Sequence, residues 1–579
     1  MESVSEPSVL YCGYKCHLLS LKTMNKKNML PKYLLIFFTL LFAGCNYLDY
    51  NEEDFFEDEM VFQNFERTRN FLNNIYSQLP SGFNEVGGSM RASASDDAVE
   101  AYSLSSINIF VDGRWSPEQP IDDRWNHYYT AIRSVNQLLS HYDLSVLDER
   151  RYNDNYPEMI KEYELFDDQA RFLRAYFYFE LMRRYAGVPL LNGTVLELDE
   201  VNEVRHNSFS EVVSFIVEEC DTVIETLPVD YDNIPGQPNK GRVTRGAAMA
   251  LKARTLLYAA SPLHNPSNDL SKWETAAAAC YALIDSVNQN GWYSLEADYS
   301  NVVNNSESVE LILGRRFTAS ASFEQSNFPV GYEGALPGTC PTQNLVNTYE
   351  MINGVDIDET GSLYNPDRPY RFRDPRLEKT ILFNESVWKE RPVEVWRGGL
   401  DGPPLERATK TGYYLKKYVD ENVSLDPNSR VRTEHVWVFM RYGEILLNYA
   451  EAMNEAYGPT DLRDYELSAV QAMDLIRIRA GLPAYNGEMT KEAVRQEIRD
   501  ERRTELAFEN HRFWDIRRWM IGEETNTILG MDITRNEDGT FSYSEVEVEN
   551  RVWDQKYNLY PIPQTEIFLN PNLVQNPDW

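Results

Sequence analysis

Three long segments with helical periodicity constrain the fold of this chain more than any other feature of its sequence. They share alanines, large aromatic residues and a terminal glycine or proline, and they cover Asp168–Leu191, Gly246–Pro262 and Arg441–Pro459. In the first segment, Phe172, Tyr176 and Phe179 fall on one helical face. Alanines let neighbouring helices approach closely, as in helix-pair repeats of the tetratricopeptide type. The pattern therefore predicts a mainly helical scaffold, an alpha–alpha superhelix of tetratricopeptide-like helical pairs.

Residues that start and stop helices flank these segments. Asp168 is expected to cap the first helix, and the Gly-Val-Pro sequence that begins at Gly187 is expected to end it. Further helices are expected at Ala276–Ser286, Leu467–Ala480 and Lys491–Trp519. The main segments are unevenly spaced, so any repeat is degenerate and interrupted by insertions.

The middle of the chain lacks this periodicity and is rich in glycine, proline, asparagine and aromatic residues. Such segments form surface loops, and loops on a rigid frame commonly carry binding residues. Short strands are expected near Val309–Phe317 and at a hairpin around Asn536–Gly539. We therefore divide the chain into an extension with a signal peptide (1–44), an acidic tether (45–58), a helical part (59–310), a loop-rich ligand-face segment (311–430) and a C-terminal helical part (431–579).

A short apolar segment near the N-terminus, Tyr33–Gly44, has lysines before it and small residues at its end. It is twelve residues long, whereas a membrane-spanning helix needs about 20 apolar residues. The pattern predicts a secretory signal peptide, with Met24 as an alternative start. Cys45 follows directly, as in bacterial lipoproteins, so we expect its thiol to carry the lipid (diacylglycerol, with palmitate). The alternative is an ordinary signal peptide with an unrelated cysteine.

Charge and cysteine content exclude several classes of protein. Lys and Arg total 56 against 90 Asp and Glu, a formal net charge of −34. A chain this acidic without a basic stripe does not bind nucleic acid. In the body, Cys220, Cys280 and Cys340 form neither a disulfide framework nor a zinc spacing. Cys220 and Cys280 lie in helical patterns and are expected to be buried as small apolar residues.

Catalytic and metal motifs are weak. Residues Asp356–Gly361, with Asp367, are similar to a calcium loop but lack its fifth-position ligand, which favours a polar turn. No G-x-S-x-G motif occurs, and Ser261 is expected to end a helix. No cofactor is therefore expected.

Carboxylates at helical spacing near the C-terminus, Glu501, Glu505 and Glu509, stand among several arginines. Paired carboxylates can perform glycoside hydrolysis, but the general acid then needs a raised pKa. Nearby guanidinium groups lower a carboxyl pKa, so we interpret these residues as structural ion pairs. Arg373, Asp374 and Arg376 in the RDPRL sequence are expected to pin a loop to the helices in the same way.

From Cys45 to Trp579 the sequence resembles the SusD/RagB family, the surface lipoproteins of nutrient uptake in Bacteroidetes. The resemblance is carried by ordered blocks at Trp125–Asn136, Ala170–Leu190, Gly241–Asn265, Pro341–Gly354, Arg373–Leu377, Thr411–Tyr418, Arg441–Ala456, Glu501–Trp519 and Tyr560–Trp579. It implies a protein that binds oligosaccharides, or in some members peptides, outside the cell. Such proteins cover a SusC-like TonB-dependent barrel in the outer membrane, and most are not enzymes.

The resemblance thus implies an outer-membrane protein that faces the exterior and touches the membrane through its lipid anchor alone. Two alternatives stay open. The protein could cover the same barrel but bind peptides, or it could be a surface glycoside hydrolase.

A sugar-binding site needs exposed aromatic faces with polar groups at their edges. Asp96 matches the family stretch in which an aspartate lies beside the ligand. Loop segments elsewhere supply the remaining candidates for ligand binding, Arg114, Trp115, Phe323, Tyr332, Trp388 and Trp396. Each of these side chains has the alternative of packing under its own loop.

Overall fold

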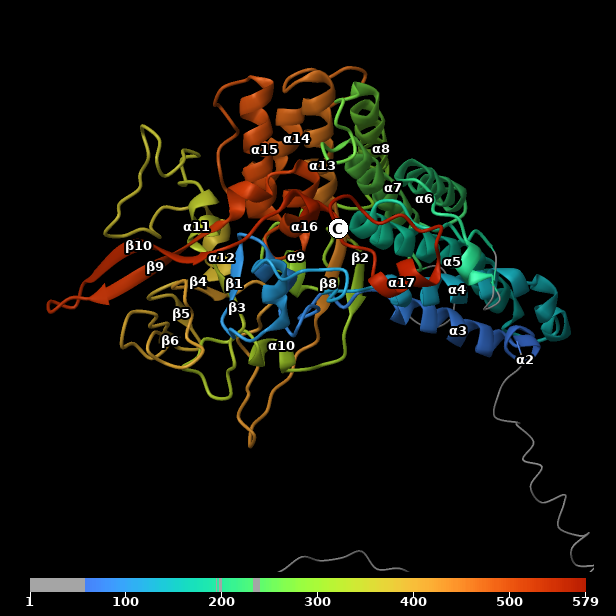
Figure 1. Ribbon diagram of the computed structural model, residues 1–579, viewed down its shortest axis with the longest axis horizontal. Coiled ribbons are helices and arrows are strands. Elements are labelled where there is room, and N and C mark those ends of the chain that lie inside the picture. Colours follow the sequence, from blue (N-terminus) through green and yellow to red (C-terminus); the bar gives the residue numbers. More distant parts are fainter. Residues whose placement is uncertain (1–57, 194, 197–199, 233–239) are drawn as a thin grey trace, which may run out of the picture. The chain divides into compact units, whose positions relative to one another are not determined.

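The computed structural model describes residues 58–193, 195–196, 200–232 and 240–579 (Figure 1). Cys45 and all of the acidic tether except its last residue lie outside the described residues, so lipidation stays a prediction. Residues Val61–Trp579 form one compact unit, and from residue 61 onward the three predicted parts of the body all belong to it. Among the described helices, none is both long enough and apolar enough to cross a membrane.

Helices that follow one another in the chain pack against each other. The long ones are α3 (Phe65–Ser77), α4 (Trp125–His141), α5 (Tyr156–Tyr185), α6 (Phe209–Ile224), α7 (Arg245–Ala260), α8 (Leu270–Asn290), α13 (Tyr442–Tyr457), α14 (Ala469–Ala480) and α15 (Lys491–Glu505). From α3 to α8 each packs on the next, and α13 joins α8 to α14 and α15 (Figure 1). This succession of packed neighbours confirms the predicted helical-pair scaffold.

Two of the expected helix boundaries were wrong. Helix α5 already begins at Tyr156, with a proline in its first turn, so Asp168 lies inside the helix and does not cap it. The expected helix Lys491–Trp519 is broken, and α16 begins only at His511. Phe508 and Asn510 adopt φ values of +63° and +65°, which interrupt a right-handed helix.

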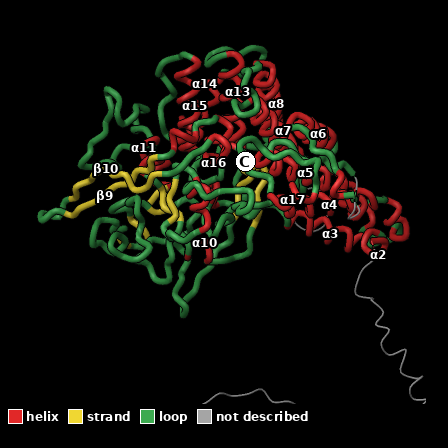
Figure 2. The backbone as a smooth tube through the Cα atoms, viewed as in Figure 1, coloured by secondary structure: helices red, strands yellow, loops and turns green. Residues whose placement is uncertain are grey.

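Two-stranded antiparallel sheets lie in the loop-rich part and in segments before and after it (Figure 2). The paired strands are β1 (Ala98–Glu100) with β3 (Thr339–Pro341), β2 (Leu311–Arg316) with β8 (Val436–Arg441), β4 (Ile381–Leu382) with β7 (Tyr414–Leu415), β5 (Val387–Trp388) with β6 (Arg391–Pro392), and β9 (Thr527–Arg535) with β10 (Phe541–Asn550). Both predicted strand regions are confirmed by β2 and by the β9–β10 hairpin.

The short α-helices are α2 (Asp58–Phe62), α9 (Asn301–Asn304), α10 (Ser322–Gln325), α11 (Gln343–Thr348), α12 (Pro375–Thr380), α16 (His511–Trp519) and α17 (Gln564–Leu569). Single 3-10 turns lie at Arg91–Ala94, Ser106–Phe110, Leu144–Arg150, Val201–Glu203, Gly522–Thr525 and Gln555–Asn558.

Cys220 and Cys280 are fully buried, and burial raises the pKa of both thiols, which confirms their predicted role as apolar residues. Ser261 follows the last residue of α7, as expected.

Candidate functional site

A cavity of about 440 Å³ lies beside α9 and β5 in the loop-rich part, and we call it the Trp388 cavity. Its volume falls in the range of about 300–1,000 Å³ that is usual for small-molecule sites. Its ring-bearing lining residues are Trp388, Tyr418 and His435. Its charged and amide lining residues are Lys379, Lys416, Asp420, Glu421, Glu434, Asn304 and Asn422. The lining is therefore rich in both hydrogen-bond donors and acceptors.

An aromatic cluster supports the inner wall of this cavity. The ring of Phe83 lies 4.6 Å from that of Phe323, 5.1 Å from Tyr418 and 4.9 Å from Trp437. Trp437 also stacks on Tyr418 at 5.2 Å. A Cβ at Gly82, whose φ is +73°, would come within 2.0 Å of the Trp437 ring, so only glycine lets the loop approach this closely. These contacts hold Tyr418 rigidly at the cavity.

Buried Glu324 anchors the polar side of the cavity. Its carboxylate lies 2.9 Å from Nε2 of His435 and accepts a hydrogen bond from the backbone N–H of Asp420 at 3.3 Å. Burial raises the pKa of Asp420, but hydrogen bonds from Asn422 and Thr433 outweigh it and bring that pKa below its ordinary value. Asp420 is therefore an ionised acceptor at neutral pH.

Lysines on the same cavity supply donors. Nζ of Lys416 donates to the backbone carbonyl of Glu378 at 2.7 Å, and burial lowers the pKa of this lysine. Nζ of Lys379 lies 3.7 Å from the carboxylate of Asp298, in an exposed pair. Because an ammonium has three donors, both lysines retain donors for a ligand.

Trp388 is brought to the cavity, but not with an open face. Its side chain is 98% buried beside Phe328, and its backbone carbonyl accepts a hydrogen bond from the Tyr332 hydroxyl at 2.7 Å. Its indole Nε1 is buried and has no hydrogen-bond acceptor among the described residues. A buried N–H without a partner is costly, so this donor marks a place where a ligand oxygen would be stabilised.

The structure thus brings Tyr332 and Trp388 together from two loops and places Phe323 in the aromatic cluster against Tyr418. The expectation that they present free ring faces needs correction. Phe323 is 4% exposed within the aromatic cluster, and Tyr332 is covered by the guanidinium of Arg391, which lies 3.9 Å from its ring centre. Aromatic side chains from separate loops pack on each other here because this removes large apolar areas from water.

Asp96 lies elsewhere and is held by arginines. Its two carboxylate oxygens accept hydrogen bonds of 2.8 Å from Arg512, and Arg503 lies 3.0 Å away. Burial raises the pKa of Asp96, yet the two guanidinium groups bring it below its ordinary value. With all of its charge already paired and 5% of its surface exposed, Asp96 ties a loop to the C-terminal helices and presents no ligand-binding group in this structure.

The other candidates do not line the Trp388 cavity. Arg114 is exposed and pairs with Asp112 at 2.5 Å. Trp115 is 3% exposed, which corrects its predicted place on the ligand face, because it packs in the core against Tyr560 and Trp579. Trp396 is half-buried, with Arg535 at 5.4 Å from its ring centre.

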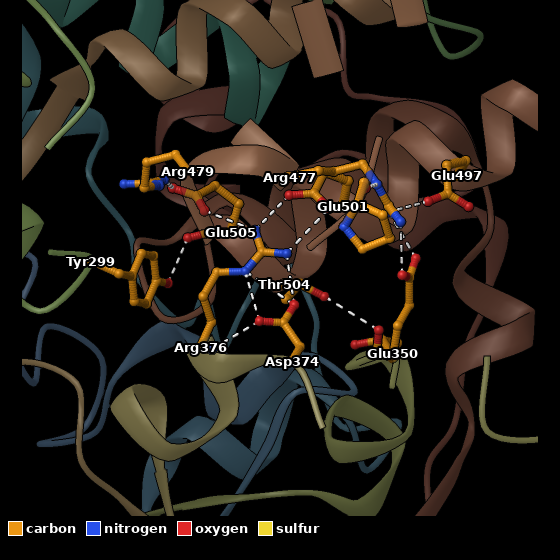
Figure 3. Close-up of polar contacts among 12 residues, drawn as sticks. Tyr299, Glu350, Asp374, Arg376, Arg477, Arg479, Glu497, Glu501, Thr504 and Glu505 are labelled. Carbon is orange, nitrogen blue, oxygen red and sulfur yellow. Dashed lines mark hydrogen bonds and ion pairs between the residues drawn. The ribbon is translucent and has the colours of Figure 1, made fainter. Parts of the chain in front are cut away.

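The C-terminal carboxylates form buried ion pairs, as predicted. Arg376 donates to Asp374, Glu501 and Glu505, and Arg477 donates to Glu350 and Glu497 (Figure 3). Despite their burial, Glu505 and Glu509 have lowered pKa values because several cations surround them. The expectation of a lowered pKa fails at Glu501, whose pKa is raised because burial outweighs its arginines.

Glu497 gives a prediction about pH. Burial, together with the neighbouring Glu350, raises the pKa of Glu497 to about 9 even though Arg477 lowers it. Between about pH 5 and pH 9 the folded protein keeps a proton that the unfolded chain has released, so the free energy of unfolding falls as pH rises in this window. We expect Glu497→Gln to flatten that fall, measured by urea unfolding across the range. Glu492→Gln, exposed on the same helix, should keep the wild-type slope, and equal slopes in both variants would contradict the account.

The polar turn predicted at Asp356–Gly361 is present as turns in the structure. Across the described ranges, no group of three or more His, Cys, Asp or Glu side chains is placed to hold a metal ion.

Comparisons with known proteins agree on one family. The model of the SusD family matches residues 285–579, and a model described as "Starch-binding associating with outer membrane" matches residues 46–257. SusD-like protein P2 of Formosa agariphila is 22% identical over 569 residues, which cover 94% of this chain and 99% of that protein.

Solved structures show the same fold. The crystal structure of a SusD-like protein from Bacteroides fragilis is 26% identical, with a TM-score of 0.74 over 90% of this chain and 99% of that one. A laminarin-binding SusD-like protein is 22% identical, with a TM-score of 0.56 over 89% of this chain and 99% of that one.

Proposed function

We propose, since the chain belongs to the SusD family, that it binds oligosaccharides in the Trp388 cavity and delivers them to a SusC-like TonB-dependent transporter. The observation that carries this proposal is the cavity lining, which mixes donors and acceptors over an aromatic wall. Sugar hydroxyls both donate and accept hydrogen bonds, so they need such a mixture. Names of relatives that bind carbohydrate or laminarin support it.

The polar groups of the cavity have distinct roles in this proposal. Ionised Asp420 accepts from ligand hydroxyls, and the ammonium groups of Lys379 and Lys416 donate to ring and hydroxyl oxygens. A small rotation of the Trp388 indole toward a bound ligand would give its unpaired Nε1 an acceptor. Charge-assisted hydrogen bonds of this kind are stronger than neutral ones and fix ligand orientation.

The proposal includes a place for the protein: the outer face of the outer membrane, held there by lipid on Cys45. The match to a family model described as associating with the outer membrane supports this. A Cys45→Ser variant should lose its fractionation with membranes, and retention of the variant there would contradict the anchor.

Binding without catalysis is the second part of the proposal. The lowered pKa of Asp420 suits an acceptor and opposes the role of a general acid, which must hold a proton near neutral pH. A surface glycoside hydrolase and a peptide-binding lid stay as the alternatives.

One experiment separates them. The purified protein is titrated calorimetrically with starch, laminarin and uronic-acid oligosaccharides and with a panel of basic and acidic peptides. The solution left after each titration is then analysed for cleavage products. We expect heat with at least one neutral sugar and no products. Heat only with peptides would favour the peptide lid, and products that disappear when a carboxylate pair is replaced would establish a hydrolase.

A further inference from the structure

A second cavity lies next to the first, and it is the basis of an inference that rests on the proposed function. It measures about 710 Å³ and is bounded by the end of α8, by the segment before α7 and by β2. Rings of Tyr231, Trp292 and Tyr293 contribute to its lining. We call it the Trp292 cavity.

Local structure directs these rings. Gly291 ends α8 in the left-handed conformation, with φ of +68°, so the chain turns there and Trp292 follows outside the helix. Tyr293 lies against the start of α7, where a Cβ at Gly246 would come within 2.4 Å of its hydroxyl. Trp292 stays half-buried.

The charges that line the Trp292 cavity balance. Its acidic residues are Asp230, Asp232 and Glu307, and its basic residues are Lys240, Arg242 and Arg316. Glu307 pairs with Lys240 at 2.7 Å and with Arg316 at 2.9 Å, so much of this charge is already neutralised at the rim. Rings combined with balanced polar groups suit a neutral sugar and offer nothing to a polyanion.

The two cavities share a wall. Asn304 lines the Trp388 cavity and Ser306 lines the Trp292 cavity, and two residues of chain span at most about 7 Å. The β2–β8 pair also lies between them, because the N–H of Phe317 donates to the carbonyl of His435, which lines the first cavity, at 2.8 Å, and the adjacent Arg316 lines the second cavity. Asn304 and Glu307 on this wall are exposed, so an extended ligand that crosses the wall at the surface would reach both cavities.

We infer that the Trp388 and Trp292 cavities are two subsites for a single neutral polysaccharide chain. The first holds the end or a short stretch of the glycan, and the second holds the sugars that follow it across the wall formed by residues 304–308. Occupying a second linked subsite adds affinity because the second contact is intramolecular. The protein would then select glycans by length as well as by sugar type.

The test compares affinities along a length series. Wild type, Trp292→Ala, Asn290→Ala and Tyr152→Ala are titrated with maltooligosaccharides and with laminarioligosaccharides, from the disaccharide to the octasaccharide. Asn290 is an exposed residue that lines the same cavity, so we expect Asn290→Ala to fold. It tests the second cavity even if Trp292→Ala fails to fold. Tyr152 is 88% exposed and lines neither cavity, which makes it a matched control.

We expect wild-type affinity to rise with length and Trp292→Ala to lose about tenfold for the longest sugars, the size of one lost aromatic stacking contact. The same variant should bind the shortest sugars as wild type does, which also shows that it is folded. Asn290→Ala should show a smaller loss of the same kind. If both variants match wild type at every length, the second subsite is overturned while the Trp388 cavity stands. If wild type binds no sugar of either series, the proposed function and this inference are both overturned.

Discussion

Replacing Arg441 with methionine is expected to lower the free energy of unfolding by about 3–5 kcal/mol, the usual cost of removing one partner from a buried ion-pair network. The Arg441 guanidinium pairs with Glu310 at 2.5 Å, with Glu505 at 2.8 Å and with Glu509 at 2.7 Å, and all four side chains are buried. Methionine fills a similar volume but leaves these carboxylates with less compensating charge. Urea unfolding followed by tryptophan fluorescence measures the change.

Arg150→Met is the control for this prediction. Arg150 pairs with Glu66 at 2.9 Å on the surface, where both side chains are partly exposed, and such pairs contribute at most about 1 kcal/mol. If Arg441→Met and Arg150→Met unfold at the same urea concentration, the buried ion pairs of Arg441 with Glu310, Glu505 and Glu509 do not stabilise the fold more than a surface pair does.

Replacing Asp420 with asparagine is expected to weaken oligosaccharide binding by about tenfold to a hundredfold. A hydrogen bond to a charged group contributes about 1.5–3 kcal/mol, which corresponds to that range of affinity. Asparagine keeps the side-chain shape and can still accept from the backbone N–H of Asn422, which donates to Asp420 at 2.9 Å. The loss would therefore report the missing charge, measured by calorimetric titration with the best-binding sugar.

Asp426→Asn is the matched control. Asp426 occupies an equivalent turn, in which the N–H of Asn428 donates to its carboxylate at 2.8 Å, but it does not line the Trp388 cavity. Wild-type affinity in Asp420→Asn, or an equal loss in Asp426→Asn, would show that the ligand does not contact this carboxylate.

Much of the helical scaffold is predictable from the sequence because helical periodicity is local. Alanines and aromatic residues at helical spacing mark α5, α7 and α13 directly. The break between α15 and α16 is not visible, because it includes a positive φ at Phe508, a bulky residue that rarely adopts one, and a positive φ at Asn510, a residue that adopts it more readily but is also found inside helices. Asn510 alone is too weak a signal to place the break.

The site is much less predictable, because its parts come together only in the fold. Trp388 could be identified as an aromatic residue in a loop, but the cluster behind Tyr418 forms only because Phe83 meets Tyr418 and Trp437, which lie more than 300 residues later in the chain. Asp96 was chosen because it matches a family sequence stretch. Its ion pair with Arg512, which lies far along the chain, gives it a structural role that the sequence does not reveal. Trp292 follows a helix-ending glycine, a signal that was present in the sequence but does not by itself distinguish a binding ring from a core ring.

The crystal structure of the protein with the starch or laminarin oligosaccharide that gives the largest titration heat tests the central claim most directly. We expect an intact sugar chain in the Trp388 cavity, with hydroxyl groups within hydrogen-bond distance of the Asp420 carboxylate and of the lysine ammonium groups. A cleaved chain, or a sugar bound elsewhere while this cavity holds none, would contradict the claim.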